Sequence, residues 1–524
     1  MAAPADMARA VCLGLLAVLP LTASAVAPVA KPSLLRARLN SDIASTNPGV
    51  TRDENTDAVL MHMVEGLVAY REDAGIGPML AQRWDVSPDG RSYTFHLRPG
   101  IRFHNNAPMT SADVLWSFRR YLDPRTHWRC LREFTGGGFA KITDVRAIDP
   151  LTVRVTLDRP SPTFLQTLAR VDCGATAILH RNSVARDGSW RVPIGTGPFR
   201  FAGWKRNQYV ELARFAGYRA LPGPRDGNGG GKHALVDRVR FMVIPDLVSA
   251  QAALLRGDLD IVDNIQPLDA LQLKARRDIR LSVAPAMDIF ALLFQTTDGR
   301  MADARLRQAI AMTIDVPALV NAISEGNSRA NRSVVPATSA YYSKIQAAMP
   351  RPNITAARRL AAAAGYRGEP IRLITNRRYP ELFDAAILVQ AMALEAGIDI
   401  RIETLDWAAQ LDRYYSGKYQ AMMFAYSARL DPSLSYESFI GDKTADPRKV
   451  WGDAGAQALL LQSRATGDHA ARQAVLDRLH LRFMQQVPAV ILFNQGHITA
   501  VRVNVRGYRG WAAAQMRLWG VAIK

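Results

Sequence analysis

Residues 80–114 constrain the fold of this chain more than any other stretch of its sequence. Ser-Pro-Asp-Gly at 87–90 predicts a turn, because proline fixes φ and glycine tolerates positive φ. Apolar and polar side chains then alternate over 92–97, which predicts a half-buried strand. Thr110 or Ser111 predicts the cap of a following helix. The segment is therefore expected to fold as a turn, a strand and a capped helix in close succession.

The particular residues of this segment fit a narrower pattern. They read LA-x-x-W, then DG-x-x-Y-x-F-x-LR-x-G-I-x-FHN, then T-x-x-DV, with departures at Asn106 and Ser111. This order resembles the signature of the bacterial extracellular solute-binding proteins, family 5, which includes the periplasmic dipeptide-, oligopeptide- and nickel-binding components of ABC importers. Further matches, such as Pro-Ile-Gly-Thr-Gly-Pro-Phe at 193–199, extend the resemblance over about residues 35 to 510.

The resemblance implies an α/β, two-lobed type II periplasmic-binding-protein fold with hinge strands and an extra domain inserted in lobe I. The implied division is a signal peptide at 1–25, lobe I at 26–70, 194–285 and 490–524, the inserted domain at 71–193, and lobe II at 286–489. Strand-like and helix-like segments alternate between residues 371 and 402, which supports a mixed α/β lobe. Thr355 predicts the cap of an Ala-rich helix that ends at Gly365.

The N-terminus has the pattern of a cleavable signal peptide. An apolar run at 13–21 follows Arg9, and Ala-Ser-Ala at 23–25 supplies small residues for cleavage after Ala25. The run is shorter than the roughly 20 residues that span a bilayer, so a membrane anchor is the less favoured alternative. We therefore expect a periplasmic protein.

Cleavage would leave Cys130 and Cys173 as the remaining cysteines. An oxidising compartment allows such a pair to form a disulfide. The sequence does not show that the two residues meet, so two free buried thiols remain a nearly equal alternative.

The net charge of +19 raises the possibility of a nucleic-acid or anionic-surface partner. The arginines, however, are scattered singly, without a basic arm or an aromatic-basic stripe. We therefore expect a monomer that faces the anionic envelope and binds no nucleic acid, with a basic envelope or nucleic-acid binder as the alternative. The Gly-rich run at 223–232 lacks the flanking pattern of a phosphate-binding loop, so we expect a flexible surface loop there.

The sequence carries no recognisable catalytic or metal-binding motif. Its nine histidines form no His-x-x-x-His, His-Glu-x-x-His or Cys/His cluster, and there is no Gly-x-Ser-x-Gly elbow. We therefore expect no cofactor, no metal and no enzyme activity. A secreted hydrolase on a similar scaffold is the alternative from another class.

The loop at 424–432 is the first candidate for ligand binding, since it resembles the family's G-W-x-x-D-x-x-DP loop. In the family's dipeptide binders the first Asp of that loop holds the ligand's amino terminus, and the alignment places Ala428 there. Arg429 follows, which is compatible with an anionic group on the ligand, while Asp431 or another acid would then serve the amine. An equal alternative is that Arg429 pairs internally with Asp431 or Glu437.

The remaining candidates are Thr51, Arg52 and Asp53 in the family's first cleft loop, together with the aromatic residues Trp407 and Tyr426. Core packing is the favoured alternative for Trp407. We expect a peptide or peptide-like solute as ligand and the permease subunits of an ABC importer as partners. Nickel is ranked low, because no histidine lies in the 424–432 loop.

Overall fold

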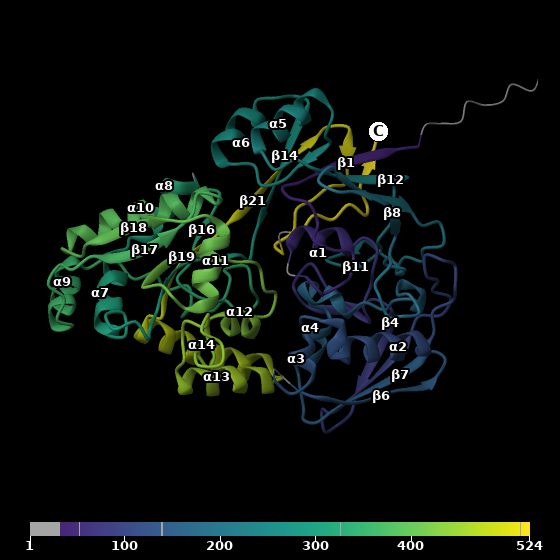
Figure 1. Cartoon of the computed structure of the whole chain (residues 1–524), viewed down its shortest axis with the longest axis horizontal. Coiled ribbons are helices and arrows are strands. Elements are labelled where there is room, and N and C mark those ends of the chain that lie inside the picture. The colour runs from purple at the N-terminus through teal and green to yellow at the C-terminus, as the bar shows by residue number, and fades with distance from the viewer. Residues whose placement is uncertain (1–31, 52, 138–139, 325, 514) are drawn as a thin grey trace, which may run out of the picture. The chain divides into compact units, whose positions relative to one another are not determined.

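The computed structural model of the protein is drawn in Figure 1. It describes residues 32–51, 53–137, 140–324, 326–513 and 515–524. The predicted signal peptide and Arg52 lie outside the described residues. Residues 33–524 form one compact unit. In the described part of the chain, none of the helices combines the length and the apolar character that a membrane span requires.

A seven-stranded sheet forms the centre of what we call lobe I (Figure 1). In spatial order its strands are β14 (Ile279–Pro285), β21 (Gly496–Arg502), β13 (Ile261–Val262), β1 (Leu34–Leu39), β12 (Arg238–Val243), β9 (Tyr209–Arg214) and β8 (Phe199–Lys205). Only β1 pairs in parallel, with β12 and β13. Its helices are α1 (Glu54–Leu60), α5 (Leu247–Arg256) and α6 (Pro267–Lys274).

A six-stranded sheet forms the centre of lobe II. In spatial order its strands are β16 (Arg329–Ala330), β20 (Ala489–Asn494), β15 (Ile289–Phe294), β19 (Ala421–Tyr426), β17 (Ile371–Thr375) and β18 (Ile400–Thr404). Its helices are α7 (Ala304–Thr313), α8 (Val316–Ser324), α9 (Ile354–Ala363), α10 (Pro380–Glu395), α11 (Trp407–Ser416), α12 (Pro432–Phe439), α13 (Ala454–Ala465) and α14 (His469–Gln486).

The central strands of lobe II are apolar throughout because both faces of the sheet are covered. Every residue of β15 and β20 is buried. Alternate residues of β15 enter different hydrophobic clusters: Ile289 and Leu293 join one, and Phe290 and Leu292 join the other. The lobe therefore has a hydrophobic layer on each face of its sheet.

A four-stranded antiparallel sheet contains the segment that opened the sequence analysis. Its strands are β4 (Ala81–Val86), β5 (Ser92–Leu97), β7 (Thr152–Leu157) and β6 (Ile142–Asp149), and its helices are α2 (Ser111–Leu122), α3 (Leu131–Phe134) and α4 (Phe164–Leu168). The alternation of β5 is confirmed, since every second side chain is buried. Thr110 caps α2, and its backbone N–H donates to Asp113 at 2.9 Å.

Short strand pairs complete the fold: β2 (Val68–Tyr70) with β3 (Ile76–Pro78), β10 (Arg225–Asp226) with β11 (Gly229–Gly230), and β22 (Val505–Arg506) with β23 (Ala522–Ile523).

Two local expectations were wrong. The helix cap is Asn353 and not Thr355, because the Asn353 side chain accepts the N–H of Ala356 at 2.9 Å. The run at 223–232 is not simply a surface loop, because Lys232 is 2% exposed and its ammonium lies 3.4 Å from the carboxylate of Glu65.

Two chain crossings connect the two lobes at one place. Residues 286–288 lead from β14 of lobe I to β15 of lobe II, and Gln495 leads back from β20 to β21. The crossing strands pair with each other on both sides, with Pro285 opposite Gly496 and Phe290 opposite Phe493. Because both crossings are short and adjacent, they have the arrangement of a hinge.

Candidate functional site

The two crossings place Asp288 and His497 next to each other at the hinge. Nε2 of His497 lies 2.6 Å from Oδ2 of Asp288, and Nδ1 lies 3.0 Å from Oδ1 of Asn264. Burial works to lower the pKa of His497, but the hydrogen bond and the negative charge of Asp288 outweigh it and raise that pKa to about 9. The hinge therefore holds an imidazolium–carboxylate pair, which we call the hinge pair.

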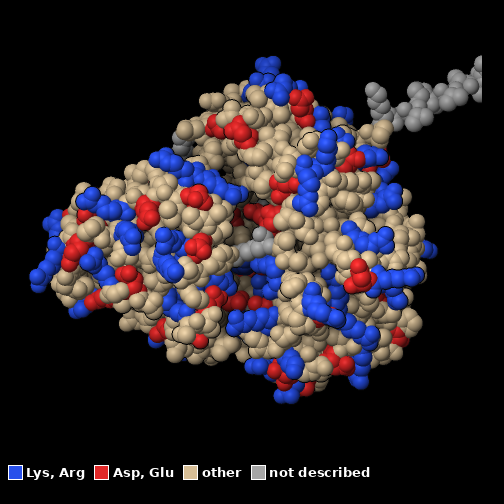
Figure 2. All heavy atoms as spheres, viewed as in Figure 1, with Lys and Arg blue, Asp and Glu red and all other residues tan. Residues whose placement is uncertain are grey.

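A cavity opens beside the hinge pair on the lobe I side. Its space, counted with its open mouth, is about 630 Å³. The polar and aromatic side chains that line it are Asn40, Glu54, Asn55, Asp263, Asn264, His497, Thr499, Tyr508, Trp511 and Gln515. Figure 2 shows both acidic and basic side chains gathered along a hollow in the face drawn there. A concave site with a few convergent polar groups over an aromatic floor is typical of small-molecule binding.

Glu54 is the first residue of α1 and faces this cavity. Solvent reaches its side chain, although protein surrounds it. The surrounding protein raises the pKa of Glu54 to about 7, and the negative charges of Asp288 and Asp263 add to the effect. Among the described residues, no three His, Cys, Asp or Glu side chains gather as metal ligands.

The loop after β19 reaches the hinge through its backbone. The N–H of Ala428 donates to Oδ1 of Asp288 at 2.8 Å. Ala428 occupies the position at which the resemblance puts an amine-binding Asp. The carboxylate nearest to this backbone thus comes from the hinge segment and not from the loop itself.

Asp431 is bound within lobe II. Its Oδ1 accepts the N–H of Ser433 at 2.9 Å and a guanidinium hydrogen of Arg472 at 2.7 Å. Burial works to raise the pKa of Asp431, but the charge of Arg472 outweighs it and lowers that pKa. Asp431 is 4% exposed and caps α12, so its carboxylate holds the loop in shape.

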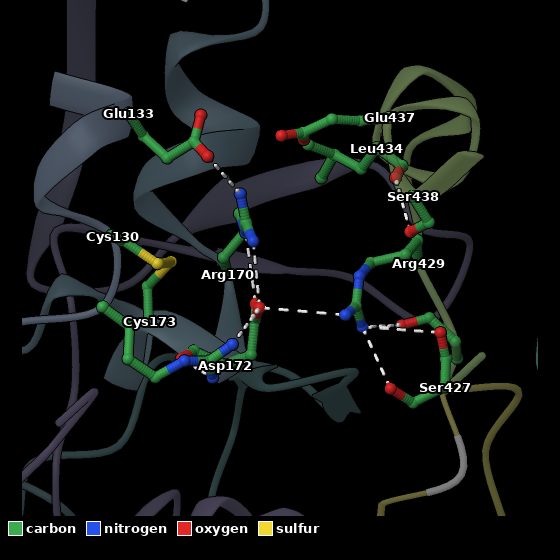
Figure 3. Close-up of polar contacts among 12 residues, drawn as sticks. Cys130, Glu133, Arg170, Asp172, Cys173, Ser427, Arg429, Leu434, Glu437 and Ser438 are labelled. Carbon is green, nitrogen blue, oxygen red and sulfur yellow. Dashed lines mark hydrogen bonds and ion pairs between the residues drawn. A yellow bond between two sulfur atoms is a disulfide. The ribbon is translucent and has the colours of Figure 1, made fainter. Parts of the chain in front are cut away.

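Arg429 extends from the same loop toward the opposite wall (Figure 3). Its Nη2 lies 3.9 Å from Oδ2 of Asp172, and its Nη1 donates to the carbonyl of Ala428 at 3.1 Å. Two further arginines hold Asp172: Arg170 at 2.9 Å and Arg129 at 3.7 Å. Burial works to raise the pKa of Asp172, but Arg170 and Arg429 hold that pKa well below its usual range.

Glu133, Glu437 and Arg464 continue this group of charges. We call the set the inter-lobe cluster, and its members are Arg129, Glu133, Arg170, Asp172, Arg429, Glu437 and Arg464. The structure joins Cys130 and Cys173 in a disulfide with their Cα atoms 5.6 Å apart. The disulfide ties the segment that carries Arg129 and Glu133 to the segment that carries Asp172, as Figure 3 shows.

The two described residues of the first cleft loop have different surroundings. Asp53 caps α1, because its Oδ2 accepts the N–H of Thr56 at 3.0 Å. Thr51 is partly buried, and its hydroxyl finds no hydrogen-bond partner among the described residues. The third member, Arg52, lies outside the described residues.

The two aromatic candidates belong to a packed group in lobe II. Tyr426 is 5% exposed, and its hydroxyl accepts a hydrogen bond from Tyr414 at 3.3 Å. Trp407 is half-buried, with its ring stacked on Phe424 at 5.8 Å and edge-on to Tyr379 at 5.2 Å. Both side chains are thus packed against other aromatic rings.

The structure brings only part of the predicted set together. Ala428 and Arg429 lie between the lobes, whereas Asp431 and Tyr426 are directed into lobe II.

Sequence reasoning missed the hinge pair and Asp172. Asp288 stands directly before the apolar strand β15, and His497 is the second residue of β21, two positions after the crossing at Gln495. A lone charge at the end of a fully buried strand is the signal that would have marked Asp288. Nothing in the local pattern marks Asp172.

The family model of bacterial extracellular solute-binding proteins, family 5 Middle, matches residues 75–446. The chain is 24% identical over 484 residues to the dipeptide-binding protein of Escherichia coli (strain K12), covering 88% of each chain. It is 28% identical over 498 residues to the di/tripeptide-binding protein 4 of Pseudomonas aeruginosa (strain UCBPP-PA14), covering 89% of this chain and 90% of the relative.

Among solved structures, the chain is similar to the periplasmic binding protein AgaA of A. tumefaciens R10 in complex with agropinic acid. The TM-score is 0.78 at 26% identity, covering 94% of this chain and 99% of that one. This likeness extends over both sheets and the crossings between them. It confirms the predicted α/β, two-lobed type II periplasmic-binding-protein fold.

Proposed function

Because the chain belongs to the bacterial extracellular solute-binding proteins, family 5, we propose that it captures a peptide or peptide-like solute between its lobes and delivers it to the permease of an ABC importer. The predicted family is confirmed, and with it the role of solute binding. A peptide ligand is supported by the relatives, which are a dipeptide-binding protein and a di/tripeptide-binding protein.

The observation that carries this proposal is the pair of short crossings at the hinge. Each lobe has its own sheet and hydrophobic core, so a few backbone torsions at residues 286–288 and 495 suffice to move one lobe against the other. We propose the division that the resemblance implies, with 71–193 inserted in lobe I, except that lobe II extends through β20 to Asn494. Closure on a solute then presents a different surface to the membrane permease.

A peptide is a zwitterion, so its burial between the lobes calls for charges of both signs. We propose that Glu54 and Asp263 face the ligand's amine, and that Arg429 faces its carboxylate. Thr51 is placed to add a hydrogen bond. In this scheme Asp431 supports the loop from inside lobe II, and Trp407 shapes the adjoining wall.

We propose a periplasmic location after cleavage at Ala25. The family is extracellular, and a disulfide such as Cys130–Cys173 persists in an oxidising compartment. Mass spectrometry of the N-terminus of protein recovered from the periplasm tests the cleavage site. An intact residue 1 in that fraction contradicts it.

A thermal-shift screen tests the proposed ligand class. The panel contains di- and tripeptides, agropinic acid, glutathione and nickel chelates. A binder present at 100 times its Kd stabilises the folded protein by about 2.7 kcal/mol and raises its Tm. Mass spectrometry of solute released from freshly purified protein provides an independent identification. If no peptide or peptide-like compound raises the Tm, and none is released, the proposed ligand class is wrong.

A further inference from the structure

Two carboxylates meet from opposite sides of the inter-lobe cluster. Glu133 comes from α3 beside the disulfide, and Glu437 comes from α12 of lobe II. Figure 3 shows their side chains directed toward one another. Neither is freely solvated, because the side chains of Glu133 and Glu437 are 14% and 28% exposed. The negative charge of Glu437 acts on Glu133, and two such charges inside protein disfavour the doubly ionised state.

Every element around the two acids contributes charges. Facing Glu133 are Arg170 and Asp172, and from lobe II Glu437 and Arg464. Facing Glu437 are Arg464, Arg170, Lys449 and Arg429. The ion-pair distances are 3.6 Å from Arg170 Nη1 to Glu133 Oε1, and 3.1 Å from Arg464 Nη2 to Glu437 Oε2.

The contacts of the two acids are unequal. Oε2 of Glu133 is buried and accepts no hydrogen bond from the described residues. Burial raises the pKa of Glu133 to about 7, and the charge of Glu437 adds to the rise. Burial works in the same direction on Glu437, but Arg464 and Arg170 outweigh it and lower the pKa of that residue. Glu133 is therefore the member of the pair that takes up a proton.

We infer that closure of the two lobes takes up a proton at the Glu133–Glu437 pair, so that acidification favours the closed, solute-holding state. This inference rests on the proposed function, since it requires that the lobes open and close. When they separate, Glu437 and Arg464 leave with lobe II, and water reaches Glu133. The disulfide keeps Glu133 and Asp172 in place, so the pair reforms in the same geometry at each closure.

The sign and size of the effect follow from linkage. The pKa of Glu133 is about 7 in the closed form, against about 4.3 for a solvated glutamate. A pKa that is raised in the closed form stabilises that form as the pH falls below 7, with the gain complete near the open-form pKa. Between pH 8 and pH 5.5 the ratio of closed to open protein rises by roughly thirtyfold.

The closed-to-open ratio is measured on the whole protein by double electron–electron resonance, which reports the distance between two spin labels. Spin labels are placed at Arg146→Cys on β6 and Leu461→Cys on α13, two exposed positions on opposite sides of the cluster. In the otherwise native protein the ratio of the short-distance to the long-distance population rises by roughly tenfold to thirtyfold from pH 8 to pH 5.5. In Glu133→Gln, which mimics the protonated acid, that ratio is already high at pH 8.

Two further variants serve as controls. Glu395→Gln makes the same change at an exposed position on α10 and keeps the native pH response. Glu54→Gln is included to separate the two acids, because the pKa of Glu54 is also raised, by neighbours at the hinge and on lobe I that include Asp288 and Asp263. A response that disappears in Glu54→Gln and persists in Glu133→Gln assigns the proton to the cavity and overturns the inference.

The outcomes for the inference and for the proposed function are distinguishable. If a solute of the screening panel shortens the distance but pH does not, closure stands and the proton coupling is wrong. If neither pH nor any solute changes the distance, the lobes do not close, and the proposed function fails with the inference.

Discussion

The hinge pair and the inter-lobe cluster both contain buried charges, but they stand in different relations to the moving parts. Asp288 and His497 lie on two adjacent crossings, so lobe rotation leaves them near the axis. Asp172 and Arg429 are carried by the walls that separate, so their contact exists only when the walls meet. A charge near the hinge therefore contributes to the stability of the fold, whereas one far from it contributes to closure.

Removing the disulfide tests how much the cross-link beside Glu133 and Asp172 contributes to the stability of the fold. The double variant Cys130→Ser/Cys173→Ser frees a loop with a sequence separation of 43, which the chain-entropy model equates with about 4 kcal/mol of unfolding free energy. Urea unfolding measures this loss. Treatment of the native protein with a reductant is the matched control and should produce a similar loss, while leaving the variant unchanged. Equal stability of variant and native protein would contradict this role.

The hinge pair makes the unfolding free energy of the protein depend on pH. The pKa of His497 is about 9 in the fold and about 6.5 in the unfolded chain, so its stabilisation is fully present below pH 6.5 and is lost as the pH rises through 9. The size of this contribution is about 3 kcal/mol. Urea unfolding between pH 6 and pH 10 measures it.

His497→Gln removes the charge and keeps an amide at the hinge. This variant is expected to lose the decline in unfolding free energy between pH 6.5 and pH 9. His96→Gln, at a histidine on β5 that pairs with the exposed Asp85, serves as the matched control and keeps the decline. If the unfolding free energy of His497→Gln declines with pH as steeply as that of the native protein, the hinge pair is not the source of the decline.

Arg429 gives the smallest expected effect when closure is measured without solute. Asp172 keeps Arg170 and Arg129 when Arg429 is removed, so Arg429→Ala is expected to lower the closed-to-open ratio only about threefold to fivefold, which is on the order of 1 kcal/mol, and to leave the unfolding free energy nearly unchanged. The distance measurement between residues 146 and 461 reports the ratio. Arg478→Ala, at an exposed arginine on α14, is the control. A change in stability without a change in the ratio would make Arg429 a residue of the fold alone.

Much of the fold could be predicted because local rules govern it. The alternation of β5 and the cap at Thr110 depend on residues a few positions apart, and both were read correctly. The error at Thr355 was local, two residues from the true cap at Asn353, whereas the other error arose from a distant partner. Lys232 was expected on the surface, yet it is buried beside Glu65, a residue far earlier in the chain.

In the candidate site, too, some features follow from the sequence and others depend on residues that are distant in the chain. The sequence by itself determined the family, the two-lobed fold and the departure at Ala428 from the family's binding loop. Only the tertiary structure decided which side chain lies beside Ala428. Asp288, 140 positions earlier in the chain, accepts the N–H of Ala428. The same carboxylate pairs with His497, which is 209 positions after Asp288. The physical reason is that charge interactions depend on distance in space, and separation along the chain carries no information about that distance once strands cross between lobes.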